Sequence, residues 1–183
     1  MVRKRKYKFF IITFIVISII LIFIKIKDYK EEQITYMHPI SIIDSREESP
    51  KVNTSSKYPD IRDKNAYYYN AVNWATSKDI VSGYKDGTFK GKFRPTDNIT
   101  REQLAVILRN YAKYKEKDVS SSVNINKFND GKYVSSFAKT GVQWAVQNKI
   151  ISGKDNGTKI DPKGNTTRGE AATMIYNYCT NIK

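Results

Sequence analysis

The apolar residues of the chain follow three successive patterns. Residues 9–24 form a run that is apolar on every face and is interrupted only by Thr13 and Ser18. Residues 29–57 show no period and carry prolines and a Ser-Arg-Glu-Glu-Ser stretch. From Tyr58 onward, apolar residues recur at helical spacing in short stretches that are separated by turn residues. The pattern therefore predicts a membrane-crossing segment, an irregular tether and a mainly helical domain.

The first run has the length and the flanks of a membrane anchor. A helix of this length covers roughly 24 Å of a ~30 Å hydrocarbon core, and Lys25 and Lys27 can extend it by snorkelling. Basic residues precede the run, which orients the N-terminus toward the cytoplasm. Because no small residue follows the run, we favour an uncleaved signal-anchor, with a cleaved signal peptide as the alternative. We expect residues 1–28 to be this anchor with its basic tip, and residues 29–57 to be a flexible linker.

From Tyr58 the chain repeats itself at an offset of 70 residues, which becomes 67 after the loss of three residues from the second copy. The aligned pairs include Trp74 and Trp144, Gly83 and Gly153, Pro95 and Pro162, Thr100 and Thr167, and Arg101 and Arg168. We define residues 58–117 as repeat 1 and residues 128–183 as repeat 2, with a linker at 118–127. Repetition at a fixed period is typical of architectures built from packed units.

Each repeat reads as helix, loop, helix. In repeat 1 the helices are expected at about 66–77 and 101–113, and each unit is too small to bury its apolar stripe alone. We therefore expect the two repeats to pack together. Cys179 aligns with Ala112 and is expected to be a small buried residue. A single cysteine excludes an internal disulfide, and with the single histidine, His38, it does not make a zinc site.

The charge of the chain is uneven. Its 32 Lys and Arg and 18 Asp and Glu give a net charge of +14. Residues 1–30 carry eight basic residues and one acidic residue, so half of the excess lies in the predicted anchor and the two residues that follow it. The rest of the chain is moderately cationic, which favours anionic partners such as wall polymers, acidic glycans or nucleic acid, with solubility alone as the alternative.

The start of each second helix carries the most specific motif. Thr100-Arg101-Glu102-Gln103 and Thr167-Arg168-Gly169-Glu170 both have the capping-box pattern, which accounts for the threonines and for Gln or Glu. It does not account for the arginines, because a cation in the first turn is disfavoured by about 0.3–1 kcal/mol. A guanidinium at an amide-rich helix tip is a receptor for carboxylate or phosphate. The alternatives are incidental surface arginines or an internal salt bridge.

Replacing both arginines with alanine is predicted to keep folding intact and to abolish binding of an anionic polymer. Aromatic residues provide the second set of candidates, since Trp74, Trp144 and Tyr84 could stack on sugar faces. Packing of the two tryptophans between helices is the alternative. No pair of carboxylates has a spacing that forces the two groups together, and no phosphate loop or metal-ligand series is present. We therefore expect no enzyme activity, no cofactor and no metal.

The order of these motifs resembles the S-layer homology (SLH) repeat. The matching residues of repeat 1 are Tyr58-Pro59-Asp60, Trp74-Ala75, Gly83-Tyr84, Asp86-Gly87-Thr88-Phe89, Pro95 and Thr100-Arg101-Glu102-Gln103, and repeat 2 carries a similar set. The resemblance implies helix-loop-helix repeats packed as a three-bladed pseudo-trimer. It also implies noncovalent anchoring to an anionic secondary cell-wall polysaccharide in grooves between repeats, with contacts from Arg101 and Arg168.

The chain departs from the family in having two repeats where three are usual. We expect a non-catalytic surface protein that binds the polysaccharide and links membrane to wall, with the repeats outside the cell and no nucleic-acid partner. The predicted binding residues are Arg101, Arg168, Thr100, Thr167, Tyr84, Trp74 and Trp144. The alternative is a structural or assembly protein that pairs with other SLH-containing surface proteins, or with itself, without binding polymer.

Overall fold

The structure, a computed structural model, describes residues 55–183. The predicted membrane anchor at 1–28 and nearly all of the predicted linker lie outside these residues. Among residues 55–183, no helix has the length and apolar character needed to cross a membrane.

The described part of the chain is mainly helical, as predicted. Repeat 1 contains helices α3 (Tyr69–Ser77) and α4 (Arg101–Tyr114), and repeat 2 contains α5 (Lys139–Gln147) and α6 (Arg168–Asn181). Residues 55–183 contain no strands, and their short 3₁₀ turns are η1 (Gly87–Phe89), η2 (Ile125–Lys127), η3 (Gly131–Tyr133) and η4 (Ser136–Ala138). The helix-loop-helix form of each repeat is confirmed, although α3 begins three residues later than expected.

The first helix of each repeat ends in the same way. Asp79 and Lys149 both take the left-handed conformation with φ 55°. The amide of Ile80 then donates to the Ala75 carbonyl at 2.9 Å, and the corresponding bond of Ile150 in repeat 2 is 2.8 Å long. This is the Schellman arrangement, in which an apolar residue just past the helix packs back on it. Ile80 and Ile150 are buried by this contact. This explains why the isoleucine follows the Trp-Ala pair at the same distance in both copies.

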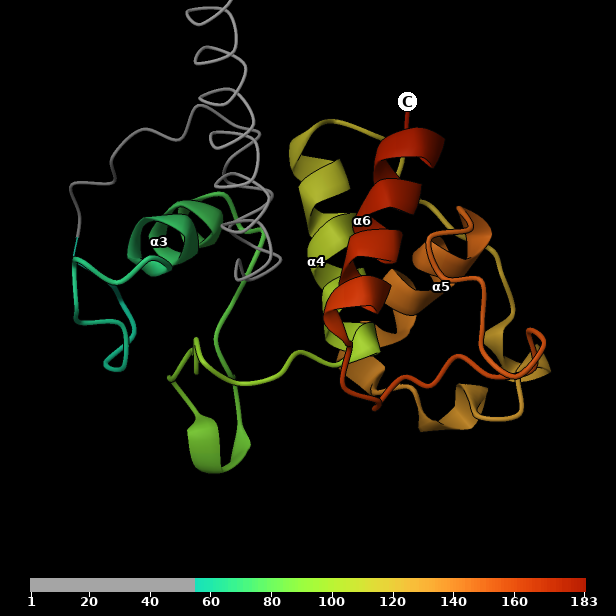
Figure 1. Cartoon of the computed structure of the whole chain (residues 1–183), viewed down its shortest axis with the longest axis horizontal. Coiled ribbons are helices and arrows are strands. Elements are labelled where there is room, and N and C mark those ends of the chain that lie inside the picture. The colour runs from blue at the N-terminus through green and yellow to red at the C-terminus, as the bar shows by residue number, and fades with distance from the viewer. Residues whose placement is uncertain (1–54) are drawn as a thin grey trace, which may run out of the picture. The chain divides into compact units, whose positions relative to one another are not determined.

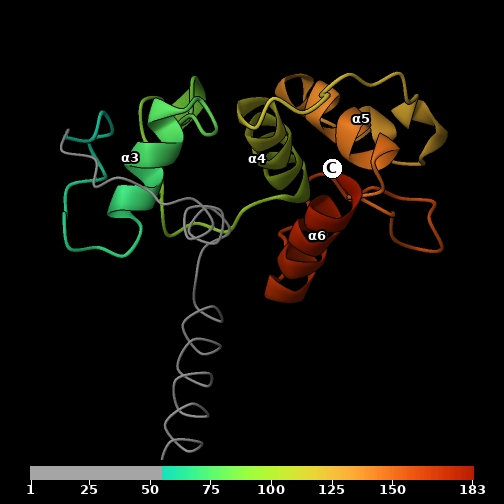
Figure 2. The same ribbon diagram turned by 90° about the horizontal axis from the view of Figure 1, so that it is seen from above.

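Helix α4 connects the two repeats. It packs against α5 and, less extensively, against α6, and Figures 1 and 2 show these three helices grouped together. One apolar core runs through both repeats, with fully buried side chains that include Leu104, Leu108, Val142, Trp144 and Ile150. The expectation that the repeats pack together is confirmed. The second helix of repeat 1 is therefore part of the core of repeat 2.

The buried stripe of α4 is wider than that of α6. Ala112 is fully buried in α4 because this helix has neighbours on more than one side. The aligned Cys179 in α6 is exposed, so the prediction of a buried cysteine was wrong. Helix α6 buries only the face that carries Met174 and Tyr178, and Cys179 lies one position beyond it.

Candidate functional site

The tips of α4 and α6 form the predicted capping boxes. Thr100 Oγ1 accepts a hydrogen bond from the Gln103 amide at 3.3 Å, and Gln103 Oε1 accepts one from the Thr100 amide at 2.9 Å. Thr167 and Glu170 make the same reciprocal pair at 3.2 and 2.9 Å. Both boxes are therefore confirmed. The two threonines proposed as ligand contacts use their hydroxyls to begin their helices.

The tip of α4 is covered by the backbone of repeat 2. The amide of Arg101 donates to the Gly164 carbonyl at 3.1 Å, and the amide of Glu102 donates to the Pro162 carbonyl at 3.1 Å. Arg101 Nε donates to the carbonyl of Ile160 at 2.9 Å. These are the donors that an external anion at this tip would need. In this structure they hold the two repeats together.

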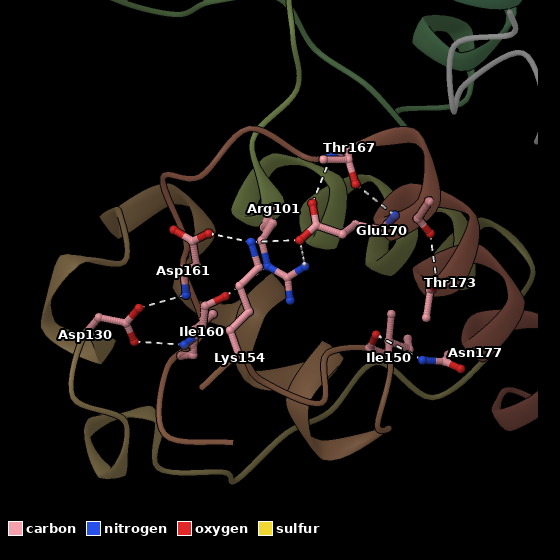
Figure 3. A network of polar contacts seen from close by, with 11 residues as sticks. Arg101, Asp130, Ile150, Lys154, Ile160, Asp161, Thr167, Glu170, Thr173 and Asn177 are labelled. Atoms are coloured by element: carbon pink, nitrogen blue, oxygen red, sulfur yellow. Dashed lines mark hydrogen bonds and ion pairs between the residues drawn. The ribbon is translucent and has the colours of Figure 1, made fainter. Parts of the chain in front are cut away.

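The side chain of Arg101 is only 6 % exposed. Besides its bond to Ile160, its Nη1 lies 3.6 Å from Glu170 Oε1, and Figure 3 shows the guanidinium directed toward this carboxylate. Of the alternatives that the sequence left open, the internal ion pair therefore describes Arg101, with glutamate as the partner. This arginine connects the first turn of α4 to the first turn of α6.

Glu102 is a part of this junction that the sequence did not reveal. It is 3 % exposed, and its carboxylate accepts hydrogen bonds from the amide and the hydroxyl of Ser135 at 2.9 and 2.8 Å. Lys163 Nζ adds an ion pair at 2.7 Å and also contacts the Ser135 hydroxyl. A buried carboxylate needs such partners. The aligned residue Gly169 gives no hint of the role, because it has no side chain.

A second ionic cluster surrounds Glu170. Lys154 Nζ lies 2.7 Å from Glu170 Oε1 and 2.7 Å from Asp161 Oδ2 (Figure 3). The Lys154 ammonium, followed by the amide of Thr167, lowers the pKa of Glu170 to about 2. Hydrogen bonds to Asp161 and Glu170 raise the pKa of Lys154. The lysine that replaces Tyr84 in repeat 2 thus joins the loop of that repeat to the tip of α6.

Each repeat also carries an aspartate that holds its loop. Asp130 accepts hydrogen bonds from the amides of Ile160 and Asp161 at 2.8 and 2.7 Å, and Asp60 holds the matching loop of repeat 1. Burial acts to raise the pKa of Asp60, but bonds from the amides of its loop outweigh this effect and lower the pKa. Asp60 and Asp130 align at the 70-residue offset, and this alignment was the sequence signal for their shared role.

The predicted aromatic contacts lie in different surroundings. Trp74 is 2 % exposed and packs edge-on against Tyr114, with ring centroids 5.9 Å apart. Trp144 is fully buried, and its Nε1 donates to the Asp118 carbonyl at 3.1 Å. The tryptophans therefore pack between helices. Tyr84 is half-buried in its loop, and its ring lies edge-on against the ring of Phe89.

The tip of α6 is open where the tip of α4 is covered. Thr167, Arg168 and Gly169 are all exposed, whereas Arg101 and Glu102 are buried. The predicted residues therefore do not form one site. Arg101 lies inside the junction, Arg168 lies at the surface, and the tryptophans lie in the core.

Repeat 2 also has an open depression of about 510 Å³. Its lining consists of Lys127, Phe128, Val146, Lys149, Ile151, Ser152 and Gly157. A smaller depression of about 250 Å³ shares Lys127 and Phe128 with it and is also lined by Asn126, Asn129 and Lys132. Lys127 Nζ lies 5.3 Å from the centroid of the Phe128 ring. The sequence did not predict this surface, because its residues come from segments that lie far apart in the chain.

Comparison with known proteins assigns the described domain to one family. The family model for the S-layer homology domain matches the chain twice, at residues 57–105 and 127–172. The chain is 32 % identical over 122 residues to an endoglucanase of Bacillus sp. (strain KSM-635) and 35 % identical over 126 residues to an amylopullulanase of Thermoanaerobacterium thermosulfurigenes. It is 32 % identical over 133 residues to cell surface glycoprotein 1 of Acetivibrio thermocellus.

These matches cover 67 %, 67 % and 70 % of this chain but only 12 %, 6 % and 6 % of the relatives. The similarity is thus to a small portion of much longer proteins. No solved structure matches the chain.

Proposed function

Because the chain belongs to the S-layer homology domain family, we propose that it is a non-catalytic protein whose repeats bind an anionic wall polysaccharide noncovalently. SLH domains are anchoring modules of the cell surface and cell wall. The endoglucanase and the amylopullulanase share with this chain a region that makes up 12 % or less of their length. We further propose that the predicted N-terminal anchor ties the repeats to the membrane, so that the chain links membrane and wall.

The observation that carries the proposal is the lysine-lined depression of repeat 2. Its volume of about 510 Å³ suits an oligosaccharide segment, and Phe128, Val146 and Ile151 give it an apolar lining for the faces of sugar rings. Lys127 and Lys149 supply two ammonium groups. Within residues 55–183 neither lysine forms an ion pair with a carboxylate. Such a surface favours a sugar chain that carries carboxylate or phosphate groups.

Arg168, Thr167 and Tyr84 are retained as proposed polymer contacts, because their side chains are exposed or half-buried. Arg101 and the two tryptophans are left out, since a polymer would reach them only after the junction or the core had opened. The proposed binding surface therefore lies mainly on repeat 2, where Lys149 replaces the Asp79 of repeat 1.

The test is co-sedimentation of the full chain, solubilised in detergent, with purified cell walls before and after removal of their anionic polysaccharide. We expect binding to require the polysaccharide and to weaken as salt is added. Lys127→Glu with Lys149→Glu should weaken binding by about tenfold or more. The matched control is Lys139→Glu with Lys183→Glu, which makes the same charge change at exposed positions elsewhere. Binding that persists on stripped walls, or that responds equally to both double variants, contradicts the proposal.

A further inference from the structure

The loop around η1 in repeat 1 carries a charge that its counterpart in repeat 2 lacks. We call residues 84–94 the η1 loop; they align with residues 154–161 of repeat 2. The η1 loop contains three lysines and one arginine against one aspartate, whereas residues 154–161 contain two lysines and two aspartates. Its net charge is therefore +3, and that of its counterpart is zero.

In repeat 2 the charges of this segment serve the fold. Lys159 Nζ lies 2.8 Å from Asp155 Oδ2. Lys154 Nζ lies 2.7 Å from a carboxylate oxygen of Asp161 and 2.7 Å from one of Glu170. Both lysines of the segment are thus paired with carboxylates of the same chain.

The η1 loop is held by rings and backbone bonds instead. The Arg94 guanidinium lies 3.7 Å from the centroid of the Phe89 ring, and the Tyr84 ring lies edge-on to Phe89 with centroids 5.6 Å apart. The amide of Tyr84 donates to the Lys92 carbonyl at 2.9 Å, and the amide of Gly91 donates to the Tyr84 carbonyl at 2.9 Å. The closure of this loop therefore needs no ion pair from a lysine.

Three ammonium groups of the η1 loop are consequently left to the solvent. Lys85, Lys90 and Lys92 are exposed, and within residues 55–183 none of them forms an ion pair, either with Asp86 of the same loop or with another carboxylate. The field of Lys92 reaches Asp60, but the oxygens of that carboxylate accept hydrogen bonds from amides of the loop. Like charges gathered in one loop repel one another. Because no internal contact offsets this repulsion, the excess charge points to an anionic partner outside the chain.

We propose that Lys85, Lys90 and Lys92 form a second contact surface for the wall polymer and bind phosphate or carboxylate groups spaced along it. The inference rests on the proposed function and adds a role for repeat 1 to it. Ammonium groups are point charges on flexible stems, so this surface responds to the charge density of the polymer and not to the identity of its sugars. The depression of repeat 2, with its apolar lining, selects the sugar. Two surfaces that hold the same polymer bind it more tightly than either does alone.

The rings of the η1 loop favour a polymer over a lipid surface. Segments that lie on a bilayer bury exposed apolar side chains among the acyl chains. Here Tyr84 and Phe89 are half-buried against each other, and the turn residues Asp86 and Thr88 are polar and exposed. The loop thus offers charge without an apolar group that enters a bilayer.

The first test is the rate at which each lysine of the full chain, in nonionic detergent, is acetylated, measured by mass spectrometry. Inorganic polyphosphate is the probe, because it is a linear polyanion without sugar, and dextran is the uncharged control. Polyphosphate should slow acetylation of the three η1-loop lysines by about threefold or more, and dextran should not. The comparison lysines are exposed, lie outside the loop and should change less: Lys117, Lys139 and Lys183.

The second test is co-sedimentation of the full chain with purified cell walls. The triple variant Lys85→Gln, Lys90→Gln and Lys92→Gln should weaken binding by about tenfold at low salt and make it less sensitive to added salt. The matched control carries the same three changes at the comparison lysines and should bind as the wild type does. Circular dichroism of both variants checks that their fold is kept.

The outcomes separate this inference from the proposed function. Wild-type binding that does not require the polysaccharide overturns both. Wild-type binding that requires it, with equal binding by the two triple variants, overturns only the role of the η1 loop. Equal protection of all six lysines by polyphosphate overturns that role too, because it would indicate a diffuse response to charge. Protection by mixed micelles that contain phosphatidylglycerol, and not by polyphosphate, would assign the loop to a lipid surface and also overturn it.

Discussion

Helices α4 and α6 begin with nearly the same residues but have different surroundings. Both start at a threonine cap with arginine next and a reciprocal Gln or Glu at the third position. Arg101 is buried between the repeats, whereas Arg168 is exposed. The local sequence therefore fixes how each helix begins, and the segment that packs over the tip decides what the arginine does. The same motif is thus buried between the repeats in one copy and exposed at the surface in the other.

The largest expected difference between the tips is in stability. Arg101→Ala should lower the free energy of unfolding by about 2–4 kcal/mol, because it removes a charge-assisted bond to Ile160 and leaves that buried carbonyl without a donor. Arg168→Ala should change it by no more than about 0.5 kcal/mol, as is usual for an exposed side chain. Urea unfolding followed by the fluorescence of the two buried tryptophans measures both values.

This result would revise the sequence-based prediction that folding survives the loss of both arginines. Equal losses of unfolding free energy in Arg101→Ala and Arg168→Ala would contradict this prediction, because they would mean that the covered and the exposed tips contribute equally to stability. The Arg101→Lys variant separates the effect of the charge from that of the guanidinium geometry. Lysine keeps the charge but loses the fixed geometry of the guanidinium, so it should recover only part of the lost stability.

A second expected difference lies in the response to acid. The third residue of α6 is Glu170, whose pKa is lowered to about 2, while α4 has the neutral Gln103 there. A carboxyl group with a lowered folded-state pKa stabilises the fold at pH values above its ordinary 4.5, and this stabilisation is lost as the pH falls toward 2. In Glu170→Gln the side-chain oxygen can still accept a hydrogen bond from the Thr167 amide, as Gln103 does from the Thr100 amide. The variant loses the ion pair with Lys154.

The wild type should therefore exceed Glu170→Gln in stability by about 1–2 kcal/mol at neutral pH. The gap should close between pH 4.5 and 2. Other carboxylates with lowered pKa values, such as Asp60, are present in both proteins and cancel in the difference. Urea unfolding at a series of pH values measures this gap. A gap that stays constant down to pH 2 would show that the Lys154 pair does not stabilise the folded chain.

Much of the fold could be predicted from the repeat alone. Helical spacing gave the four described helices, and the Thr-Arg motif gave both capping boxes, because each depends on residues close together in sequence. Packing of the repeats against each other followed from their small size. Cys179 was misplaced because alignment with Ala112 assumes equal surroundings, and α6 has fewer neighbours than α4.

The junction could not be predicted, because its contacts join residues far apart in the chain. Glu102 reaches Ser135 and Lys163, and neither spacing nor periodicity links these positions. The anion-binding interpretation of Arg101 considered only its own helix tip, whereas the partner comes from repeat 2. The proximity of Lys127 and Lys149 in the depression could not be predicted for the same reason, since the two lysines lie in different segments.

The caps themselves should differ by a smaller amount. Thr100→Ala removes a cap that lies inside the junction and should cost about 1–2 kcal/mol, and Thr167→Ala at the exposed tip should cost about 0.5–1 kcal/mol. Water can replace the lost hydroxyl at the exposed tip more easily than at the covered one. The same urea unfolding assay, with Thr→Ser at each position as the conservative control, measures the difference. A larger cost at Thr167 would indicate that the α6 tip is the more constrained of the two.

The smallest expected effect has the opposite sign. A Cβ atom at position 169 would meet no atom within 4 Å beyond the neighbouring residues and the backbone of its own helix, and Gly169 does not have a positive φ. Gly169→Ala should therefore stabilise the chain by about 0.5–1 kcal/mol, since alanine has less conformational freedom than glycine in the unfolded chain. Thermal unfolding of the two proteins at the same concentration measures this gain. The aligned Glu102 is packed on every side, so loss of stability in Gly169→Ala would mean that the α6 tip is covered within one copy as the α4 tip is. That outcome would mean that the two helix tips are equally buried. A gain in stability would instead indicate that the tips differ because a segment of repeat 2 packs over α4 and none packs over α6 within one copy.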